Sequence, residues 1–316
     1  MKNFRSYFDF LASTLSLAAV LGMSSPMQGQ ASAAHQDSNA SARFSVVVEG
    51  PAAGKAPDVI LIPGLGSSRA VYAAEAKILS ADFRLHLVQI AGFAGEPTGP
   101  NGEGAILAPV VEQLHQYIAD NHLEHPAVIG HSLGGLLALM LADAHPGDAG
   151  KVLVVDALPF YGLIFSPNAT VEMLKPQAQA MHDSLLAQPP DQFAASQPLF
   201  AARLAANPEG QKAVAAGSIA SDRRVFAEAM LEDLSTDLRP RLSSIKTPVT
   251  VLYPYQAGEG AKSEVEELYK GAYAGMPQVR FQCIDDSLHF IMFDQPRAFH
   301  LAVVNFLGGK VSAPGK

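Results

Sequence analysis

His125-Pro126-Ala127-Val128-Ile129-Gly130-His131-Ser132-Leu133-Gly134-Gly135 is the stretch that decides the fold. Residues 126–129 form a short apolar run that suits a buried parallel strand. Residues 136–144 are apolar and rich in alanine and leucine, which predicts a helix. The stretch therefore predicts a strand and a helix joined by a sharp turn, the repeating unit of α/β proteins.

Ser132 lies at that turn. A sharp strand-to-helix turn leaves no room for a Cβ two residues before and two residues after the serine, and Gly130 and Gly134 occupy both places. The turn would raise the hydroxyl above the sheet edge and direct the first N–H groups of the helix at a ligand. Ser132 is a candidate nucleophile, although so short a pattern is also compatible with an ordinary glycine-rich turn.

The rest of the chain repeats the alternation of strand and helix. Helices are expected at residues 71–79, 104–121, 261–273 and 294–307. This order predicts an α/β fold with a mostly parallel, doubly wound sheet. The expected strands are residues 44–48, 58–62, 83–90, 126–129, 151–155, 247–253 and 278–284.

Residues 158–242 interrupt the alternation with helical segments that contain many prolines. We interpret this segment as a helical cap, inserted after the strand that ends near Asp156 and lying over the carboxyl edge of the sheet. Residues 44–157 and 243–309 are then the core. Within the cap, four charged residues are expected to form a solvated helix face: Arg223, Arg224, Glu228 and Glu232.

Residues 1–33 have the features of a secretory signal peptide: a basic start, an apolar run at residues 11–23, and the cleavage pattern Ala31-Ser32-Ala33. An uncleaved membrane anchor is the alternative. We expect an exported protein, periplasmic or secreted, with a disordered leader at residues 34–43. No cysteine stands near the cleavage site to carry a lipid, so no stable membrane insertion is expected after cleavage. The single cysteine, Cys283, lies in an apolar strand and is expected to pack in the core.

The charge balance disfavours polyanionic partners. The chain carries a formal charge of −8, and residues 1–33 contribute +1 through Lys2, Arg5 and Asp9, which leaves −9 for the remainder. Nucleic acids and anionic membrane surfaces are therefore not expected as partners. With 48% hydrophobic and 16% charged residues, the composition is typical of a globular protein with a well-filled core.

A serine nucleophile needs a base, and His289 is the best-placed of the ten histidines. It lies in a short loop between the last strand and the last helix, at the same sheet edge as Ser132. His131 is expected to pack near the loop that follows the second strand. His122 and His125 have a spacing that superficially suggests metal ligands, but no third ligand lies nearby, so neither a metal nor a cofactor is expected.

An oxyanion formed at Ser132 would need two backbone donors. The Leu133 amide, at the start of the helix, is one. The loop Gly64-Leu65-Gly66 follows the second strand and offers the other, for which the Leu65 amide is the best candidate. A turn that simply needs flexible glycines is the alternative explanation for this loop.

These motifs occur in the order found in the α/β-hydrolase superfamily, which the chain resembles over residues 44–307. The segments Gly130-His131-Ser132-Leu133-Gly134-Gly135 and Ser287-Leu288-His289-Phe290 are similar to those of capped, esterase-like serine hydrolases. The resemblance implies the α/β-hydrolase fold and a Ser-His-acid triad. The related haloalkane dehalogenases have aspartate at the position of Ser132, which argues against that chemistry here.

The third member of the triad departs from the family's common pattern. The loop after residues 247–253 has no carboxylate before Glu259. Some members carry the acid after the preceding strand, where this chain has Asp156. Asp156 is our preferred acid and Glu259 the alternative, and Asp285, Asp286 or no acid at all stay open.

The sequence thus predicts an exported serine hydrolase that cleaves a small-molecule ester through an acyl-enzyme, without a cofactor. Phe160, Tyr161 and Phe165 are expected to line a pocket for an apolar acyl or alcohol group. The alternatives are the same triad acting on a lactone, an amide or a carbon–carbon bond, and a non-catalytic ligand-binding member of the fold. The sequence carries no signal for an oligomeric state.

Overall fold

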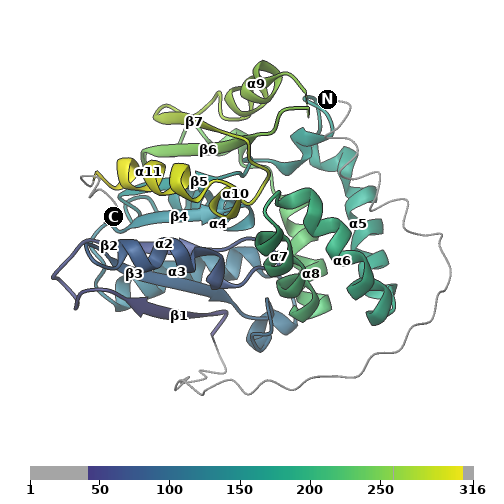
Figure 1. Ribbon diagram of the computed structural model, residues 1–316, viewed down its shortest axis with the longest axis horizontal. Helices are drawn as coiled ribbons and strands as arrows, with labels where there is room; N and C mark the ends of the chain where they lie inside the picture. Colours follow the sequence, from purple (N-terminus) through teal and green to yellow (C-terminus); the bar gives the residue numbers. More distant parts are fainter. Residues whose placement is uncertain (1–41, 259, 309–316) are drawn as a thin grey trace.

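The described residues form one seven-stranded sheet in the order β1-β3-β2-β4-β5-β6-β7 (Figure 1). The structure is a computed structural model, and it describes residues 42–258 and 260–308. The expected signal peptide and most of the expected leader therefore lie outside the described residues. The same holds for Glu259 and for residues 309–316.

All strands of the sheet are parallel except β1, which pairs antiparallel with β3. The predicted α/β fold with a mostly parallel, doubly wound sheet is confirmed, and each predicted strand agrees with the observed one to within two residues at either end. The strands are β1 (Phe44–Glu49), β2 (Asp58–Ile62), β3 (Arg84–Ile90), β4 (Ala127–His131), β5 (Lys151–Val155), β6 (Val249–Tyr255) and β7 (Val279–Asp285).

The central strands are buried on both faces, which explains their continuous apolar sequences. In β2, Ile60 and Ile62 face one hydrophobic cluster, whereas Val59 and Leu61 face another. Helices α3 (Leu107–Asp120), α4 (Leu133–Ala144) and α9 (Lys262–Ala272) contribute to the first cluster. Helices α2 (Ala73–Leu79) and α11 (Pro296–Leu307) contribute to the second.

Between β5 and β6 the chain forms the helices α5 (Val171–Ala187), α6 (Pro190–Leu204), α7 (Pro208–Ala220) and α8 (Arg223–Ser235), here called the cap. Two of these helices begin with a proline, whose fixed φ suits a first helical residue. In Figure 1 the cap lies at the right of the sheet, beyond the carboxyl ends of the strands. Short 3-10 turns flank it, at η3 (Tyr161–Ile164) and η4 (Arg239–Arg241). Two more, η1 (Arg69–Tyr72) and η2 (Gly99–Gly102), precede α3.

Charged residues of α8 bind backbone groups, two of them in the core and one in another helix of the cap. The Glu232 carboxylate accepts hydrogen bonds from the backbone N–H groups of Ile106 (2.7 Å) and Leu107 (2.9 Å) at the start of α3. Arg224 donates to the Asn101 carbonyl (2.7 Å). Arg223 donates to the Leu185 and Gln188 carbonyls of the α5 end, at 3.1 and 2.7 Å.

The expectation of a solvated face is therefore wrong for Arg223, Arg224 and Glu232. The physical reason is that exposed ends of neighbouring helices and loops offer unpaired backbone groups, which these long charged side chains satisfy. Glu228 differs, because it lies 3.5 Å from the imidazole of His182 and makes no such backbone contact.

The last helix is attached at the other end of the sheet. The Lys151 ammonium donates to the carbonyls of Phe306 (2.9 Å) and Leu307 (3.0 Å), which end α11. Lys151 is the first residue of β5, so this contact lies at the amino edge of the parallel strands. A positive group also suits a helix C-terminus, where the backbone carbonyls point outward.

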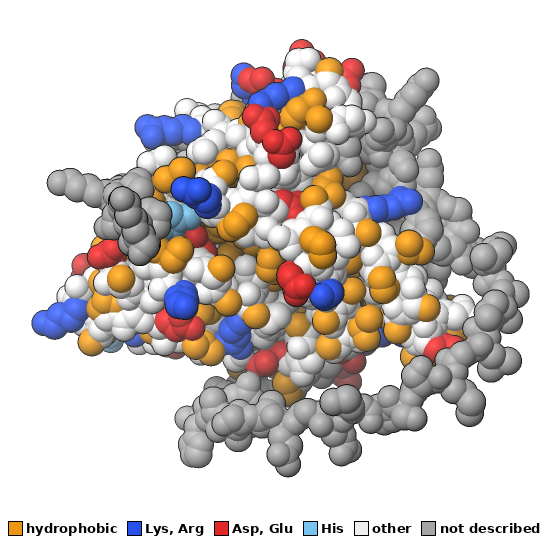
Figure 2. Space-filling view, in the orientation of Figure 1, with side chains coloured by type: hydrophobic (Ala, Val, Ile, Leu, Met, Phe, Trp, Pro, Cys, Tyr) orange, Lys and Arg blue, Asp and Glu red, His pale blue; other side chains and the backbone are white. Residues whose placement is uncertain are grey.

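The surface carries mixed charges. On the face in Figure 2, Lys and Arg side chains lie interspersed with Asp and Glu, and no broad basic patch forms among the residues described there. In the described part of the chain, no helix has both the length and the apolar character that crossing a membrane requires.

We expect Glu232→Ala to lower the free energy of unfolding by about 1–3 kcal/mol, because two backbone donors at the start of α3 lose a charged acceptor. Glu228→Ala, on the same helix, is the control and should cost about 0–1 kcal/mol, because its contact with His182 is a long, partly exposed ion pair. Urea denaturation followed by circular dichroism measures both. Equal losses in the two variants would contradict the capping role.

Candidate active site

Ser132 lies at the tip of the turn between β4 and α4. Its backbone has φ 54° and ψ −124°, an unusual conformation for a residue with a side chain, which typically costs about 1–3 kcal/mol. The Ser132 N–H donates to the Val155 carbonyl at the end of β5 (2.9 Å). Its carbonyl accepts from the Gly135 N–H (2.7 Å) in the first turn of α4. The turn is thus held from both sides.

The glycines around Ser132 are required by close backbone approaches. A Cβ on Gly130 would overlap the Gly134 carbonyl, and a Cβ on Gly134 would overlap the Ile62 carbonyl at the end of β2. A Cβ on Gly64 would come within 2.9 Å of the Ser132 Cβ. The expected lack of room on both sides of the serine is confirmed.

His289 and Asp156 come together at the carboxyl edge. His289 lies between β7 and the short helix α10 (Ile291–Asp294), and Asp156 directly follows β5. The His289 Nδ1–H donates to the Asp156 Oδ2 at 2.6 Å. Because a carboxylate only accepts, the proton of the neutral imidazole lies on Nδ1, which leaves Nε2 as its acceptor atom.

The other carboxylate oxygen of Asp156 accepts a hydrogen bond from the hydroxyl of Tyr269 on α9. Tyr269 is buried, and its ring stacks on that of Tyr253 in β6 with centroids 4.7 Å apart. Burial, and then the nearby Asp156 charge, raise the pKa of Tyr269 well above its ordinary value, so it stays a neutral donor. Both Asp156 oxygens are therefore held in place.

The two candidate oxyanion donors are free to bind a ligand. In the described part of the chain, neither the Leu65 nor the Leu133 N–H donates a hydrogen bond. Leu133 is the first residue of α4, where no intrahelical acceptor exists. Gly66 follows Leu65 with φ 63°, and a Cβ there would come within 2.6 Å of the Phe226 ring of α8. Phe226 of the cap therefore packs closely against the loop that carries the Leu65 N–H.

His131 packs against the loop that carries His289. Its Nε2–H donates to the backbone carbonyl of His289 (3.0 Å), and the two rings lie with centroids 4.6 Å apart. Its Nδ1 is fully enclosed by the protein and has no hydrogen-bond partner among the described residues. Burial, and then the proximity of His289, hold the pKa of His131 well below its ordinary value. His131 is therefore a neutral packing residue, near the Gly64 loop as expected.

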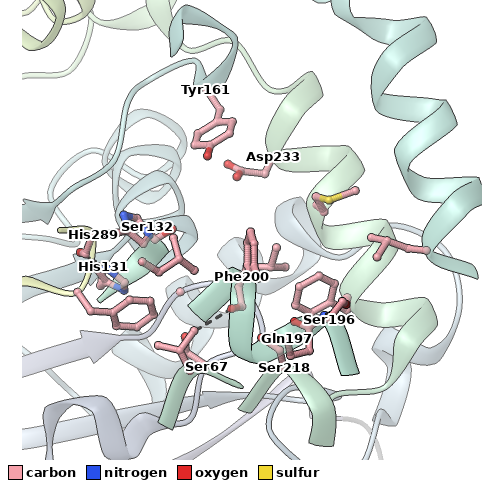
Figure 3. A pocket seen from close by; sticks show the side chains of 18 of the residues that line it. Ser67, His131, Ser132, Tyr161, Ser196, Gln197, Phe200, Ser218, Asp233 and His289 are labelled. Atoms are coloured by element: carbon pink, nitrogen blue, oxygen red, sulfur yellow. Dashed lines mark hydrogen bonds between the residues drawn. The ribbon is translucent and has the colours of Figure 1, made fainter. Parts of the chain in front are cut away.

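A cavity of about 120 Å³ separates the sheet edge from the cap. This is roughly ten times the volume that one water molecule needs, so the cavity has room for a small organic molecule. Leu65, Ser132 and His289 line it from the sheet side, and Figure 3 shows Ser132 beside His289 at its left end. The cap lines the opposite side with Leu185, Gln188, Phe193, Ser196, Gln197, Phe200, Leu204, Val214, Ser218, Phe226, Met230, Asp233 and Leu234.

This geometry agrees with the comparison to known families. Residues 59–302 match the sequence profile of the Alpha/beta hydrolase family, which is well over half of the chain. The chain belongs to the α/β-hydrolase family. The protein is accordingly a hydrolase of this fold.

Individual relatives of this hydrolase are distant. A protein of Cronobacter sakazakii that carries the name carbamate hydrolase RutD is 25% identical over 282 residues, covering 85% of this chain and 97% of that protein. The pimeloyl-[acyl-carrier protein] methyl ester esterase of Aeromonas hydrophila is 32% identical over 108 residues, covering 34% of this chain and 41% of that protein.

Solved structures show the same fold. The enol-lactonase of Burkholderia xenovorans LB400 superposes with a TM-score of 0.68 at 18% identity, covering 84% of this chain and 96% of that chain. A thermophilic esterase of Thermogutta terrifontis also superposes with a TM-score of 0.68 at 18% identity, covering 84% and 93% of the two chains.

Of the three aromatic residues expected to line the pocket, only Tyr161 does so. Phe160 is fully buried beneath the guanidinium of Arg239, 4.6 Å from its ring centre, and Phe165 packs against two hydrophobic clusters. The expectation is wrong for Phe160 and Phe165 because η3 turns both rings into the packing around the cap. Of the other candidate acids, Asp285 pairs with Lys262.

Two residues that the sequence did not single out belong to this site. Tyr269 holds the Asp156 carboxylate, and no sequence motif marks it. Asp233 lines the cavity from α8, and Figure 3 shows its carboxylate pointing toward Tyr161. Burial raises the pKa of Asp233 to about 7, although the nearby His289 opposes this shift. In the sequence it is one of two adjacent acidic residues, Glu232 and Asp233, in a helical run, which marks no specific role.

A cluster away from the cavity could hold a metal ion. His115, His145 and Asp148 have candidate ligand atoms within 4.8 Å of one another. The two imidazoles are stacked in parallel with centroids 3.9 Å apart, and each already has a carboxylate partner, Asp148 and Glu112 respectively. Parallel rings do not direct their nitrogens at one point, so this geometry fits ion pairing better than metal coordination. His122 and His125 are not part of the cluster.

We expect Gly134→Ala to destabilise the protein by about 1–3 kcal/mol or more, because the new Cβ would collide with the rigid end of β2. Gly271→Ala in α9 is the matched control, since nothing lies within 4 Å of a Cβ there. This control should be neutral or stabilising by up to about 1 kcal/mol. Thermal unfolding measures both, and equal unfolding temperatures would contradict the close approach.

The raised pKa of Asp233 predicts a pH-dependent stability. The folded protein keeps the proton up to about pH 7, whereas the ordinary value is 3.8, so this group makes stability fall as the pH rises between these values. Asp233→Asn should therefore be more stable than the wild type at pH 8, by at least about 1 kcal/mol, with a smaller difference at pH 4. Urea titrations at both pH values test this. A variant less stable at pH 8 would contradict it.

Proposed function

We propose that this protein is an exported serine hydrolase that cleaves a small-molecule ester. One observation carries the proposal: the His289 imidazole, oriented by Asp156 at 2.6 Å, lines the same cavity as Ser132. A serine hydroxyl becomes a useful nucleophile only beside a base whose tautomer is fixed in this way.

The proposed mechanism is a two-step acyl transfer. His289 Nε2 takes the proton of Ser132 Oγ while the oxygen attacks the substrate carbonyl. The resulting oxyanion binds the N–H groups of Leu65 and Leu133, and His289 then returns the proton to the leaving alcohol. Water, activated by the same imidazole, attacks the acyl-enzyme and releases the acid. Asp156 stabilises the imidazolium that forms in each step.

The cavity lining supports an apolar group next to the scissile bond. Leucine, valine, methionine and phenylalanine side chains of the cap face Ser132, and pockets of this kind select apolar substrate parts. One relative is named as a methyl ester esterase, which agrees with ester chemistry. Another is named as a carbamate hydrolase, so a carbamate should be assayed beside the esters. Lactones, amides and carbon–carbon bonds are the other substrates for comparison.

The export part of the proposal rests on residues 1–33 alone. Their basic start, apolar run and Ala31-Ser32-Ala33 pattern are typical of a cleaved signal peptide. Fractionation of cells that produce the full chain, with N-terminal sequencing of the exported product, would test cleavage after Ala33.

The alternative of a non-catalytic, ligand-binding protein is disfavoured. It arose because the loop after β6 carries no carboxylate before Glu259. The hydrogen bond between Asp156 and His289 supports Asp156 in the role of that acid. The geometry therefore favours an active enzyme over a binding protein.

We predict that a fluorophosphonate probe labels the wild-type protein and that Ser132→Ala abolishes labelling, because only an activated serine reacts with it. Asp156→Asn should lower kcat for p-nitrophenyl butyrate by about ten-thousandfold, since the imidazole loses its orienting charge. The measurements are gel fluorescence and release of nitrophenolate.

Glu259→Gln is the control for the acid. It should keep labelling and turnover within about twofold of the wild type, because Asp156 already holds the imidazole. If Asp156→Asn stays fully active and Glu259→Gln does not, the triad acid is Glu259. If Ser132→Ala is labelled as strongly as the wild type, the mechanism is wrong.

A further inference from the structure

Asp233 is a lone carboxylate in the cavity that also holds Ser132. The described residues lining this cavity include no Lys, no Arg and no other Asp or Glu. The Asp233 side chain makes no hydrogen bond and no ion pair with any described residue, although His289 is near enough to act on it electrostatically. Asp233 thus lacks the partner that an enclosed charge normally has.

Two polar side chains elsewhere in the cavity wall, Ser196 and Gln197, bind within their own helix. The amide of Gln197 donates to the Phe193 carbonyl (3.2 Å) and to the Ser196 hydroxyl (3.2 Å). The Ser196 hydroxyl itself donates to the Phe193 carbonyl (2.7 Å). These contacts are local to α6 and involve no atom of Asp233.

The rest of the lining would suit a cation. The rings of Tyr161, Phe193, Phe200, Phe226 and Phe290 line the same space, and aromatic faces attract positive charge. A carboxylate in a cavity lined by aromatic rings, without a competing Lys or Arg, is an arrangement that suits ammonium groups. An apolar ester without a cation would leave the Asp233 charge unpaired.

We propose that Asp233 binds a protonated amine carried by the ester substrate. The proposal rests on the proposed ester hydrolysis and names its substrate class: esters with an alkylammonium group a few carbon atoms from the scissile bond. Asp233 would accept hydrogen bonds from the ammonium, and the apolar lining would hold the chain between the amine and the ester. Binding of the amine also supplies the partner that the carboxylate lacks.

Two pairs of esters that match in shape test this. p-Nitrophenyl 6-aminohexanoate is compared with p-nitrophenyl heptanoate, and 2-(dimethylamino)ethyl butyrate with 3-methylbutyl butyrate. The wild type should prefer the cationic member of at least one pair by about tenfold or more in kcat/KM, mainly through KM. Asp233→Asn should bring that ratio to within about twofold of unity while still cleaving the neutral esters.

Glu228→Gln is the matched control, because it removes a carboxylate from the same helix outside the cavity. It should keep the wild-type preference. A wild type that shows no preference in either pair overturns the proposal, and so does a preference that survives in Asp233→Asn.

A binding measurement separates this proposal from the catalytic one. Calorimetry should show that hexylammonium binds the wild type at least about tenfold more tightly than 1-hexanol, with the difference lost in Asp233→Asn. Cation binding without ester cleavage or fluorophosphonate labelling would leave the amine site in place and refute the esterase. Cleavage of neutral esters without any preference for a cation would support the esterase and refute the amine site.

The preference should also change with pH. Burial raises the pKa of Asp233 to about 7, so the ratio for cationic over neutral ester should increase from pH 6 to pH 8 as the carboxyl group ionises. The other titratable groups lining the cavity are His131, Tyr161 and His289. On the packed helices, His182 of α5 pairs with Asp183 and Glu228, and Glu232 binds the start of α3. Because these groups also act electrostatically on a cationic ester, the ratio is measured in Asp233→Asn as well, where the increase should be absent. A ratio that stays constant across this range contradicts the assignment.

Discussion

The site depends on one close packing contact, in which the backbone of the Ser132 turn lies directly against the backbone at the end of β2. The first turn of α4 lies directly against the end of β2, which is possible only because Gly130 and Gly134 have no side chains. This contact places Ser132, the Leu133 amide and the Leu65 loop within one small volume. The unfavourable backbone conformation of Ser132 persists because β4, β5 and α4 all hold it by hydrogen bonds and packing.

The parallel sheet then brings distant residues to that same place. Asp156 and His289 are far apart in sequence, yet both follow strands whose carboxyl ends meet at one edge. The cap forms the opposite wall of the cavity, and hydrogen bonds attach it to loops of the core. The Asp222 N–H donates to the Gly92 carbonyl (2.8 Å), and the Ser221 hydroxyl accepts from the Ala94 N–H (2.9 Å). The cavity therefore exists only where the core and the cap meet.

The sequence predicted the strands closely because their burial on both faces leaves continuous apolar runs, as in β2 and β5. It brought Ser132 and His289 into one hypothesis because strand ends share an edge, and the resemblance to the α/β-hydrolase family added Asp156 as the preferred acid. It could not place Asp233, Tyr269 or Glu232, since the direction of a helical side chain depends on how the helix docks. Phe160 and Phe165 show the same limit: an aromatic residue after a strand suits a pocket wall and a buried core equally well.

Lys151 has a consequence for handling the enzyme. By binding the last carbonyls of α11, it holds the end of the described chain at the amino edge of the sheet, away from the cap (Figure 1). A protein immobilised on a bead or an electrode through this end would present its cavity to the surrounding medium. The fold thus provides an orientation for attachment that keeps the cavity away from the support.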